Sequence, residues 1–229
     1  MIELYFFWSD PSAARIRLAL SCKHVPYLAH ALRYDDDETF FNLGIARQPM
    51  VLKTEDGRLH IDSIKVLEGI DQLFPGPPSL WDGVVEPAAW EALLDWRRRV
   101  DPVLARLYAP VLPGFSDIGG NPGTLEAYKR EVQTRFGIIL EDLVNDRYAG
   151  FAQLDRISSF RSLAQHLSRQ RFYAARISVA DLLLAADLFP LELLDGVGLP
   201  VDLMYYIERV QKTCGCNLRE GLFTDPPDS

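Results

Sequence analysis

The sequence predicts a small α/β domain followed by an all-helical domain, and three features of the chain point to this. Strand-like and helix-like segments alternate over the first 75 residues. A run rich in proline and glycine follows, Phe74-Pro75-Gly76-Pro77-Pro78-Ser79. Beyond this run the strand signals nearly vanish, and long helical patterns take their place. We therefore expect residues 1–75 to form the α/β domain, 76–86 a linker and 87–229 the helical domain.

The first domain is expected to contain a mixed sheet, because a crossover unit is followed by a hairpin. Its expected elements, in order, are a strand at 2–8, a helix at 11–23, a strand at 27–32, a short helical segment opened by the acidic run 35–38, hairpin strands at 50–53 and 59–61, and a helix at 63–74. An Asp-Gly pair between the last two strands is a typical hairpin turn. On the first helix, Ile16, Ala19 and Leu20 share a face, and Arg15 and Arg17 are expected to lie off it.

The second domain is expected to be helical throughout. The helical pattern predicts segments at 87–107, 124–145, 154–171, 178–188 and 201–213. Three consecutive arginines, 97 to 99, are interpreted as a solvated face of the first of these helices, since the chain as a whole is acidic.

The composition limits the classes of partner and compartment. The chain has 229 residues, 48% of them hydrophobic and 24% charged, with a formal net charge of −8. An acidic protein without a basic patch is not expected to bind nucleic acid. No apolar run reaches 18 residues, so we expect no membrane span. The N-terminus lacks the basic segment that begins a signal peptide, so we expect no signal peptide. With only three cysteines, the sequence predicts a cytoplasmic, reducing compartment.

The cysteines and histidines predict no metal site. Cys214 and Cys216 are spaced more closely than the usual zinc pair, and Cys22 is the only other cysteine. The four histidines show no ligand spacing among themselves. We therefore interpret the cysteines as packed or surface thiols.

The turn at residues 9–13, between the first strand and the first helix, is the most informative segment. A helix N-terminus lowers the pKa of a thiol, and thiol–disulfide enzymes place a reactive cysteine in such a turn. This turn contains no cysteine. Instead, Asp10 and Pro11 have the pattern of an N-cap followed by proline at the first helical position.

The whole arrangement resembles the glutathione S-transferase fold, in which a thioredoxin-like domain precedes a helical one. Pro49 precedes a strand and hairpin, as the cis-proline of that superfamily does. Asp62-Ser63 opens a helix where the family usually has Glu-Ser, and Ser178-Val-Ala-Asp181 resembles its helix-capping box. Within the superfamily the closest likeness is to the bacterial type-two glutaredoxin, through Leu4-Tyr5, Val25-Pro26, His30, Asp35-Asp36, Gln48-Pro49, Asp62-Ser63, Leu188-Phe189-Pro190-Leu191 and Cys216-Asn217-Leu218.

The resemblance implies a glutathione-binding protein that lacks the redox chemistry of the glutaredoxins. Their Cys-Pro-Tyr-Cys motif corresponds here to Asp10-Pro11-Ser12-Ala13, so both cysteines are missing. Glutathione is then expected as ligand or co-substrate, with a small electrophile as a candidate second substrate. The alternative is a non-catalytic binding or interaction module, and both a monomer and a homodimer are compatible with the sequence.

The same resemblance assigns glutathione to particular residues. Ser63 would meet the γ-glutamyl carboxylate, and Asp62 would meet the ammonium group. A cis peptide before Pro49 would leave the backbone of Gln48 facing the cysteinyl group of the ligand. The alternative for Asp62 and Ser63 is a plain helix cap.

Asp10 is expected near the sulfur of bound glutathione. A carboxylate about 5 Å from a thiolate costs roughly 3 kcal/mol at an effective dielectric constant of about 20. If Asp10 faces the ligand, thiolate formation is therefore suppressed. If Asp10 turns back to cap the helix, Ser9 or Ser12 becomes the candidate catalytic hydroxyl that donates to the sulfur.

Overall fold

A four-stranded mixed sheet forms the first part of the computed structural model, which describes residues 1–196 and 198–223. Its strands are β1 (Glu3–Phe6), β2 (Leu28–Ala31), β3 (Met50–Lys53) and β4 (Leu59–His60). They lie in the order β2-β1-β3-β4, with β1 parallel to β2 and antiparallel to β3. This confirms the mixed sheet. Residues 197 and 224–229 of the expected helical domain lie outside the described residues.

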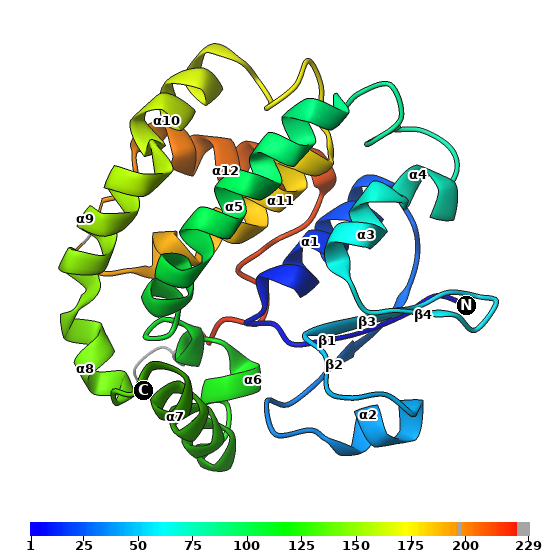
Figure 1. The fold of residues 1–229 in the computed structure, drawn as a ribbon. Helices are drawn as coiled ribbons and strands as arrows, with labels where there is room; N and C mark the ends of the chain where they lie inside the picture. Colours follow the sequence, from blue (N-terminus) through cyan, green and yellow to red (C-terminus); the bar gives the residue numbers. More distant parts are fainter. Residues whose placement is uncertain (197, 224–229) are drawn as a thin grey trace, which may run out of the picture.

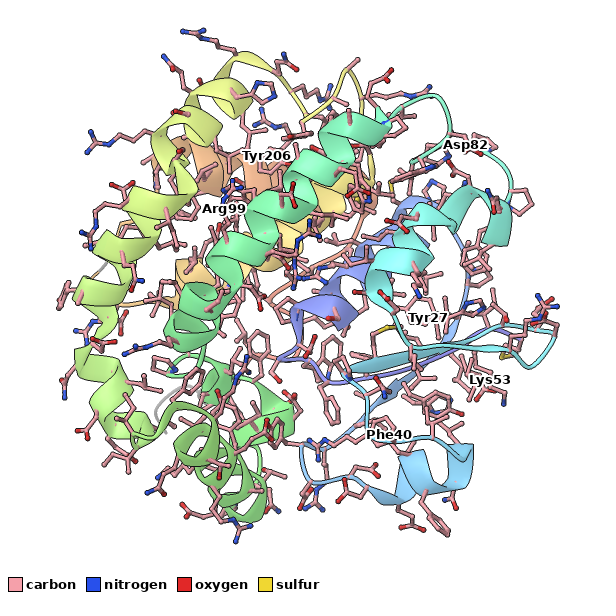
Figure 2. All side chains as sticks on the ribbon, viewed as in Figure 1. Tyr27, Phe40, Lys53, Asp82, Arg99 and Tyr206 are labelled. Atoms are coloured by element: carbon pink, nitrogen blue, oxygen red, sulfur yellow. The ribbon has the colours of Figure 1, made fainter. Side chains whose placement is uncertain are left out.

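Four helices accompany the sheet: α1 (Pro11–Cys22), α2 (Glu38–Leu43), α3 (Ser63–Glu68) and α4 (Ile70–Leu73). The helices α1 and α3 lie on one side of the sheet, and α2 lies on the other (Figure 1). Phe40 of α2 is buried between its helix and the sheet, where it packs in a cluster with Phe7 and Val51 (Figure 2). The single helix expected at 63–74 is divided at Gly69, which is the C-cap of α3.

Helices make up most of the chain after the proline-rich run. They are α5 (Pro87–Tyr108), η1 (Leu112–Gly114), α6 (Ser116–Gly119), α7 (Pro122–Phe136), α8 (Leu140–Asn145), α9 (Arg147–Ser158), α10 (Phe160–Arg169), α11 (Val179–Leu188), η2 (Phe189–Leu193) and α12 (Val201–Cys214). The predictions for α5, α11 and α12 are confirmed within one residue at each end. In the described ranges, none of the helices has the length and apolar character to cross a membrane.

Two expected helices are each interrupted. The segment predicted at 124–145 contains α7 and α8, separated after Gly137, which has a φ of +73° and caps α7 in the left-handed conformation. The segment predicted at 154–171 falls on α9 and α10, separated by Ser159 at a φ of +54°. A left-handed residue ends the helical hydrogen-bond ladder without breaking the apolar spacing, so the periodicity alone does not reveal it.

Helix α1 is enclosed on both sides, because it packs against α3 and also against α11 and α12 (Figure 1). One continuous apolar core therefore runs from the sheet into the helical part. Consequently, the expectation that Arg15 and Arg17 lie on an outer face is wrong: they are only 2% and 4% exposed. Both guanidinium groups must find partners inside the protein.

Candidate functional site

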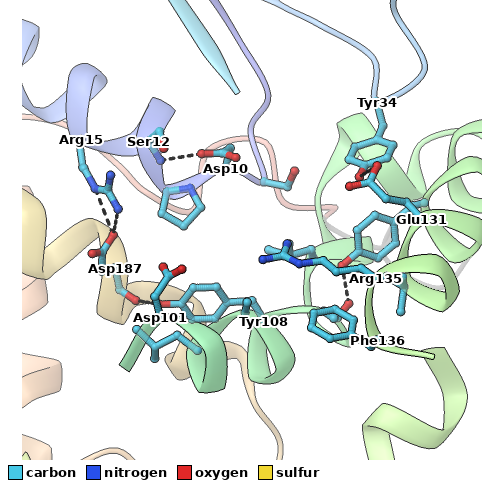
Figure 3. A pocket seen from close by; sticks show the side chains of 18 of the residues that line it. Asp10, Ser12, Arg15, Tyr34, Asp101, Tyr108, Glu131, Arg135, Phe136 and Asp187 are labelled. Carbon is cyan, nitrogen blue, oxygen red and sulfur yellow. Dashed lines mark hydrogen bonds and ion pairs between the residues drawn. The ribbon is translucent and has the colours of Figure 1, made fainter. Parts of the chain in front are cut away.

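A cavity of about 240 Å³ opens beside the turn that precedes α1 (Figure 3). Its walls come from that turn, from α5 and from α7. The turn contributes Ser9, Asp10, Pro11 and Ser12, and the wall opposite is largely aromatic and aliphatic, with Tyr34, Leu104, Tyr108, Leu112, Tyr128, Val132 and Phe136. The walls on α5 and α7 also carry charged side chains, Arg97, Asp101, Glu131 and Arg135, so apolar and charged surface lie together on that side of the cavity.

Asp10 is the N-cap of α1, which confirms the interpretation of the Asp-Pro pair. Its carboxylate accepts a hydrogen bond from the backbone N–H of Ser12 at 2.7 Å. Burial raises the pKa of Asp10 above the ordinary value, although this bond and the charge of Arg15 oppose the effect. The carboxylate turns back to the helix and still lines the cavity.

Ser9 is bound to a carboxylate from the helical part of the chain. Its hydroxyl donates to Oδ2 of Asp117 at 2.6 Å, and its backbone N–H points at the same oxygen. Asp117, on α6, is 3% exposed, and burial raises its pKa from 3.8 to about 6. Its other oxygen, Oδ1, is buried without a partner among the described residues.

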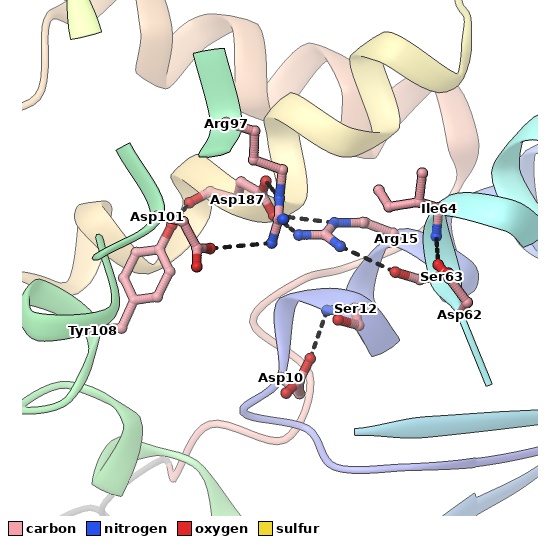
Figure 4. A network of polar contacts seen from close by, with 10 residues as sticks. All are labelled: Asp10, Ser12, Arg15, Asp62, Ser63, Ile64, Arg97, Asp101, Tyr108 and Asp187. Carbon is pink, nitrogen blue, oxygen red and sulfur yellow. Dashed lines mark hydrogen bonds and ion pairs between the residues drawn. The ribbon is translucent and has the colours of Figure 1, made fainter. Parts of the chain in front are cut away.

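Arg15 connects the sheet part of the chain to the helical part. Its guanidinium pairs with the Asp187 carboxylate on α11 and donates from Nη1 to the Ser63 hydroxyl at 3.0 Å (Figure 4). Arg97 of α5 donates to the second oxygen of Asp187 at 2.9 Å and also pairs with Asp101. Arg97 is thus part of a charged network and not of a solvated face, so the expectation for it is wrong.

Asp62 and Ser63 begin α3, and both have partners within the protein. Asp62 is exposed and caps the helix through Oδ1, which accepts from the N–H groups of Ile64 and Lys65 at 2.9 and 3.2 Å. The Ser63 hydroxyl accepts from Arg15. No acceptor for the proton of that hydroxyl lies among the residues that the structure describes, so the hydroxyl can donate to a ligand.

The peptide bond between Gln48 and Pro49 is not cis, contrary to the expectation drawn from the resemblance. Among the described residues, the cis bond joins Pro77 to Pro78. Gln48 and Pro49 are not among the residues that line the cavity, and neither are Asp62 and Ser63, although Ser63 is bonded to Arg15, which does line it. A trans bond turns the backbone of Gln48 differently, so the expected pairing with a cysteinyl group loses its geometric basis.

Sequence reasoning missed four charged residues of the site. Asp187 carried a usable signal, because it is an acid inside the apolar run 179–188, where a buried charge needs a partner. Asp117, Arg15 and Arg97 carried none, since their partners lie 90 to 172 positions away along the chain. The described residues contain no group of three potential metal ligands.

Comparison with known proteins finds similarity at the level of structure. No family model matches the sequence, and no curated protein matches it. Glutaredoxin 2 from Salmonella typhimurium, solved with glutathione, superposes with a TM-score of 0.79 at 20% identity, covering 95% of this chain and 96% of that one.

Two fungal transferases are also similar. A glutathione S-transferase of Ceriporiopsis subvermispora, solved with glutathione, gives a TM-score of 0.69 at 17% identity and covers 93% of this chain and 97% of its own. Glutathione transferase GSTFuA2 from Phanerochaete chrysosporium gives 0.69 at 16% identity, with coverages of 94% and 99%. The chain therefore has the glutathione S-transferase fold.

Proposed function

We propose that this protein binds glutathione, or a glutathione conjugate, in the cavity beside the start of α1. Residues 1–75 would serve as the thioredoxin-like glutathione-binding domain, with 76–86 as the linker. The observation that carries the proposal is the place of the cavity: it lies at the N-terminus of α1, next to residues 9–12. Similar folds have been solved with glutathione.

The γ-glutamyl carboxylate is assigned to Arg15, which lines the cavity, and to Ser63, which is bonded to Arg15 just outside the lining. The Ser63 hydroxyl keeps its proton available while Arg15 donates to its oxygen, which polarises the O–H bond. The carboxylate of the ligand would share the positive charge of Arg15 with the Asp187 carboxylate. The backbone N–H groups of Ile64 and Lys65 are already taken by Asp62, so the side chains, and not the helix start, would supply most of the recognition.

The sulfur end of the cavity favours binding without activation of the thiol. The Ser9 hydroxyl bonds to Asp117, and Asp10 holds Ser12 through its backbone N–H. Asp10 lines the cavity and Asp117 is buried behind Ser9, so both acids would oppose a developing thiolate by Coulomb repulsion. This arrangement favours a binding or interaction module over a transferase.

A glutathione transferase is the second candidate function. Its support is the apolar part of the cavity lining, where Tyr108 and Phe136 would face a small electrophile carried next to the glutathione sulfur (Figure 3). Ser12 would then be the hydroxyl that donates to the sulfur.

Titration calorimetry with reduced glutathione tests the proposal. Replacing Ser63 by alanine removes a hydrogen bond to a charged group, so we expect a loss of about 1.5–3 kcal/mol in binding free energy. Ser168→Ala, on the exposed surface of α10, is the matched control and should leave affinity unchanged. If the native protein does not bind glutathione, or if Ser63→Ala binds as tightly as the native chain, the assigned site is wrong.

A further inference from the structure

All three cysteines of the chain meet at the end of α1 that lies away from the cavity. Cys22 is the last residue of α1, Cys214 is the last residue of α12, and Cys216 follows one residue beyond Gly215. Cys22 and Cys214 are 4% and 2% exposed, and each thiol shifts the pKa of the other, which puts the two side chains next to each other. The contact joins positions that are 192 residues apart.

The backbone around the two thiols is held in place independently of them. The hydroxyl of Ser21 donates to the carbonyl oxygen of Cys214 at 2.7 Å and approaches that of Gly215 at 3.2 Å. Gly215 caps α12 in the left-handed conformation, with a φ of +67°. The ends of α1 and α12 are therefore fixed side by side, which keeps the two cysteines close to each other.

The two thiols differ in the direction of their pKa shifts. The neighbouring Cys214 thiol lowers the pKa of Cys22 against the opposing effect of burial. The Cys22 thiol, together with burial, raises the pKa of Cys214. Cys22 is therefore the sulfur that becomes a thiolate, and Cys214 is the one that keeps its proton.

We propose that Cys22 and Cys214 form an oxidisable dithiol, which hydrogen peroxide or another small hydroperoxide converts to a disulfide that joins α1 to α12. The Cys22 thiolate attacks the peroxide oxygen and breaks the O–O bond, which gives a sulfenic acid and hydroxide (water after protonation). Cys214 then attacks the sulfenic sulfur, and water leaves with the oxygen and the thiol proton. Two thiols and one hydroperoxide thus yield one disulfide, one water and a second small product. This second product is water when the oxidant is hydrogen peroxide and an alcohol when it is an organic hydroperoxide.

A small oxidant suits the surroundings of the dithiol. An open groove of about 740 Å³ lies beside it, lined by Ser21 and Cys216 among others. The groove reaches the neighbours of both reacting cysteines, while the sulfur atoms themselves are almost covered. Cys216 is half-buried, and burial raises its pKa, so it is expected to react more slowly than Cys22.

Intact-mass spectrometry on the full chain tests the inference with hydrogen peroxide as the probe. The reduced native protein should lose two hydrogens, and digestion should give one peptide pair linked through Cys22 and Cys214. Cys216→Ser is the matched control and should form the same link. Cys214→Ser should stop at the sulfenic acid of Cys22, which a 1,3-diketone reagent captures.

Other products would overturn the proposal. A link between Cys214 and Cys216, oxidation confined to Cys216, or an unchanged mass at peroxide concentrations that oxidise a free thiol would each contradict it. Cys214→Ala serves as a second variant if the serine does not fold, because alanine is small and apolar. None of these readouts depends on glutathione binding, so the two proposals fail separately.

Discussion

Position 10 determines the chemistry available at the start of α1. A cysteine there would have the N–H of Ser12 and the positive end of the helix beside its sulfur, and both lower a thiol pKa. The chain has a carboxylate instead, which takes that N–H for itself at 2.7 Å. The turn therefore offers a helix start that would lower a thiol pKa, but position 10 carries no thiol.

Replacing Asp10 by cysteine should introduce monothiol activity. We expect Asp10→Cys to catalyse glutathione-dependent reduction of a mixed disulfide, and the native chain to show none. Ser9→Cys is the matched control: its side chain is buried against Asp117, whose charge raises a neighbouring thiol pKa, so it should stay inactive. Robust turnover by the native protein would contradict this account of the turn.

Asp117 gives the stability of the protein a particular pH dependence. A buried carboxyl whose pKa is raised from 3.8 to about 6 keeps its proton longer in the folded state than in the unfolded state. The folded state then binds more protons between these values, so stability falls as pH rises from about 4 to 6.

Asp117→Asn should remove this part of the pH dependence. Relative to the variant, the native protein is expected to lose about 2.5 kcal/mol of unfolding free energy between pH 4 and pH 7, because the pKa of Asp117 is about 6 in the folded state and 3.8 as its ordinary value. Urea unfolding of both proteins across this pH range measures the difference. A constant difference at all pH values would show that Asp117 has an ordinary pKa.

At the residue scale, the sequence predicts local interactions and misses distant ones. The cap at Asp10 is visible because the N-cap and the following proline are adjacent in the chain. The hydrogen bond between Ser9 and Asp117 joins residues 108 positions apart, and no sequence pattern near either residue indicates it. Ser9 was therefore a candidate for catalysis by sequence, whereas the structure gives its hydroxyl a buried partner.

Helix α11 is the element whose local chemistry is best determined by sequence. Ser178 and Asp181 form the expected capping box, which confirms that prediction. Asp181 is fully buried and accepts from the backbone and hydroxyl of Ser178, from the N–H of Tyr173 and from the hydroxyl of Tyr206, all within 2.9 Å. This one carboxylate thus joins the start of α11 to α12 and to the preceding loop.

Asp181→Ala should destabilise the protein more than Ser178→Ala does. The first change leaves four buried donors without an acceptor, and we expect at least about 3 kcal/mol of lost unfolding free energy. The second removes one cap, at about 0.5–2 kcal/mol. Urea unfolding gives both values, with glutathione affinity as the control that should not move. Equal losses would show that the box acts only as a cap.

Helix breaks mark the limit of prediction at this scale. The interruptions at Gly137 and Ser159 both rest on a left-handed residue. Glycine at position 137 was a readable signal for a C-cap, and serine at position 159 was not, because serine seldom adopts positive φ. The apolar spacing continued through both, which made two helices look like one.

At the scale of the whole molecule, one buried carboxylate holds three helices together. Asp187 of α11 pairs with Arg15 of α1 and with Arg97 of α5, and Arg15 extends the network to Ser63 on α3. The pair of Arg15 and Asp187 is 2% and 4% exposed, so water does not screen it. The network fixes the cavity between the sheet and the helical part.

The two members of this pair should differ in what their loss costs. Asp187→Asn leaves two guanidinium groups facing each other, and we expect a loss of about 3–5 kcal/mol in unfolding free energy. Arg15→Met keeps most of the volume and leaves Arg97 to neutralise Asp187, so about 1.5–3 kcal/mol is expected. Urea unfolding measures both. A larger loss for Arg15→Met would mean that Arg97 does not compensate.

The architecture was predictable from sequence, but the enclosure of α1 was not. The alternation of strand-like and helix-like segments, the proline-rich run and the helical patterns can each be recognised within a short stretch of sequence. Together they predict an α/β part and a helical part. Which helix lies between the two parts depends on packing between distant segments. Because the sequence patterns carry no information on this packing, they place Arg15 and Arg17 off the buried face of α1 and do not reveal the network around Asp187.

The pKa of the glutathione thiol in the complex tests the central claim most directly, namely that the protein holds glutathione without activating it. Thiolate absorbance against pH, measured with saturating protein, gives this value. The account predicts a pKa at or above the ordinary thiol value of about 8.5, and a lower one in Asp10→Asn, which keeps a capping group. A native complex whose thiol titrates well below that value, unchanged in Asp10→Asn, would contradict the account and favour a transferase.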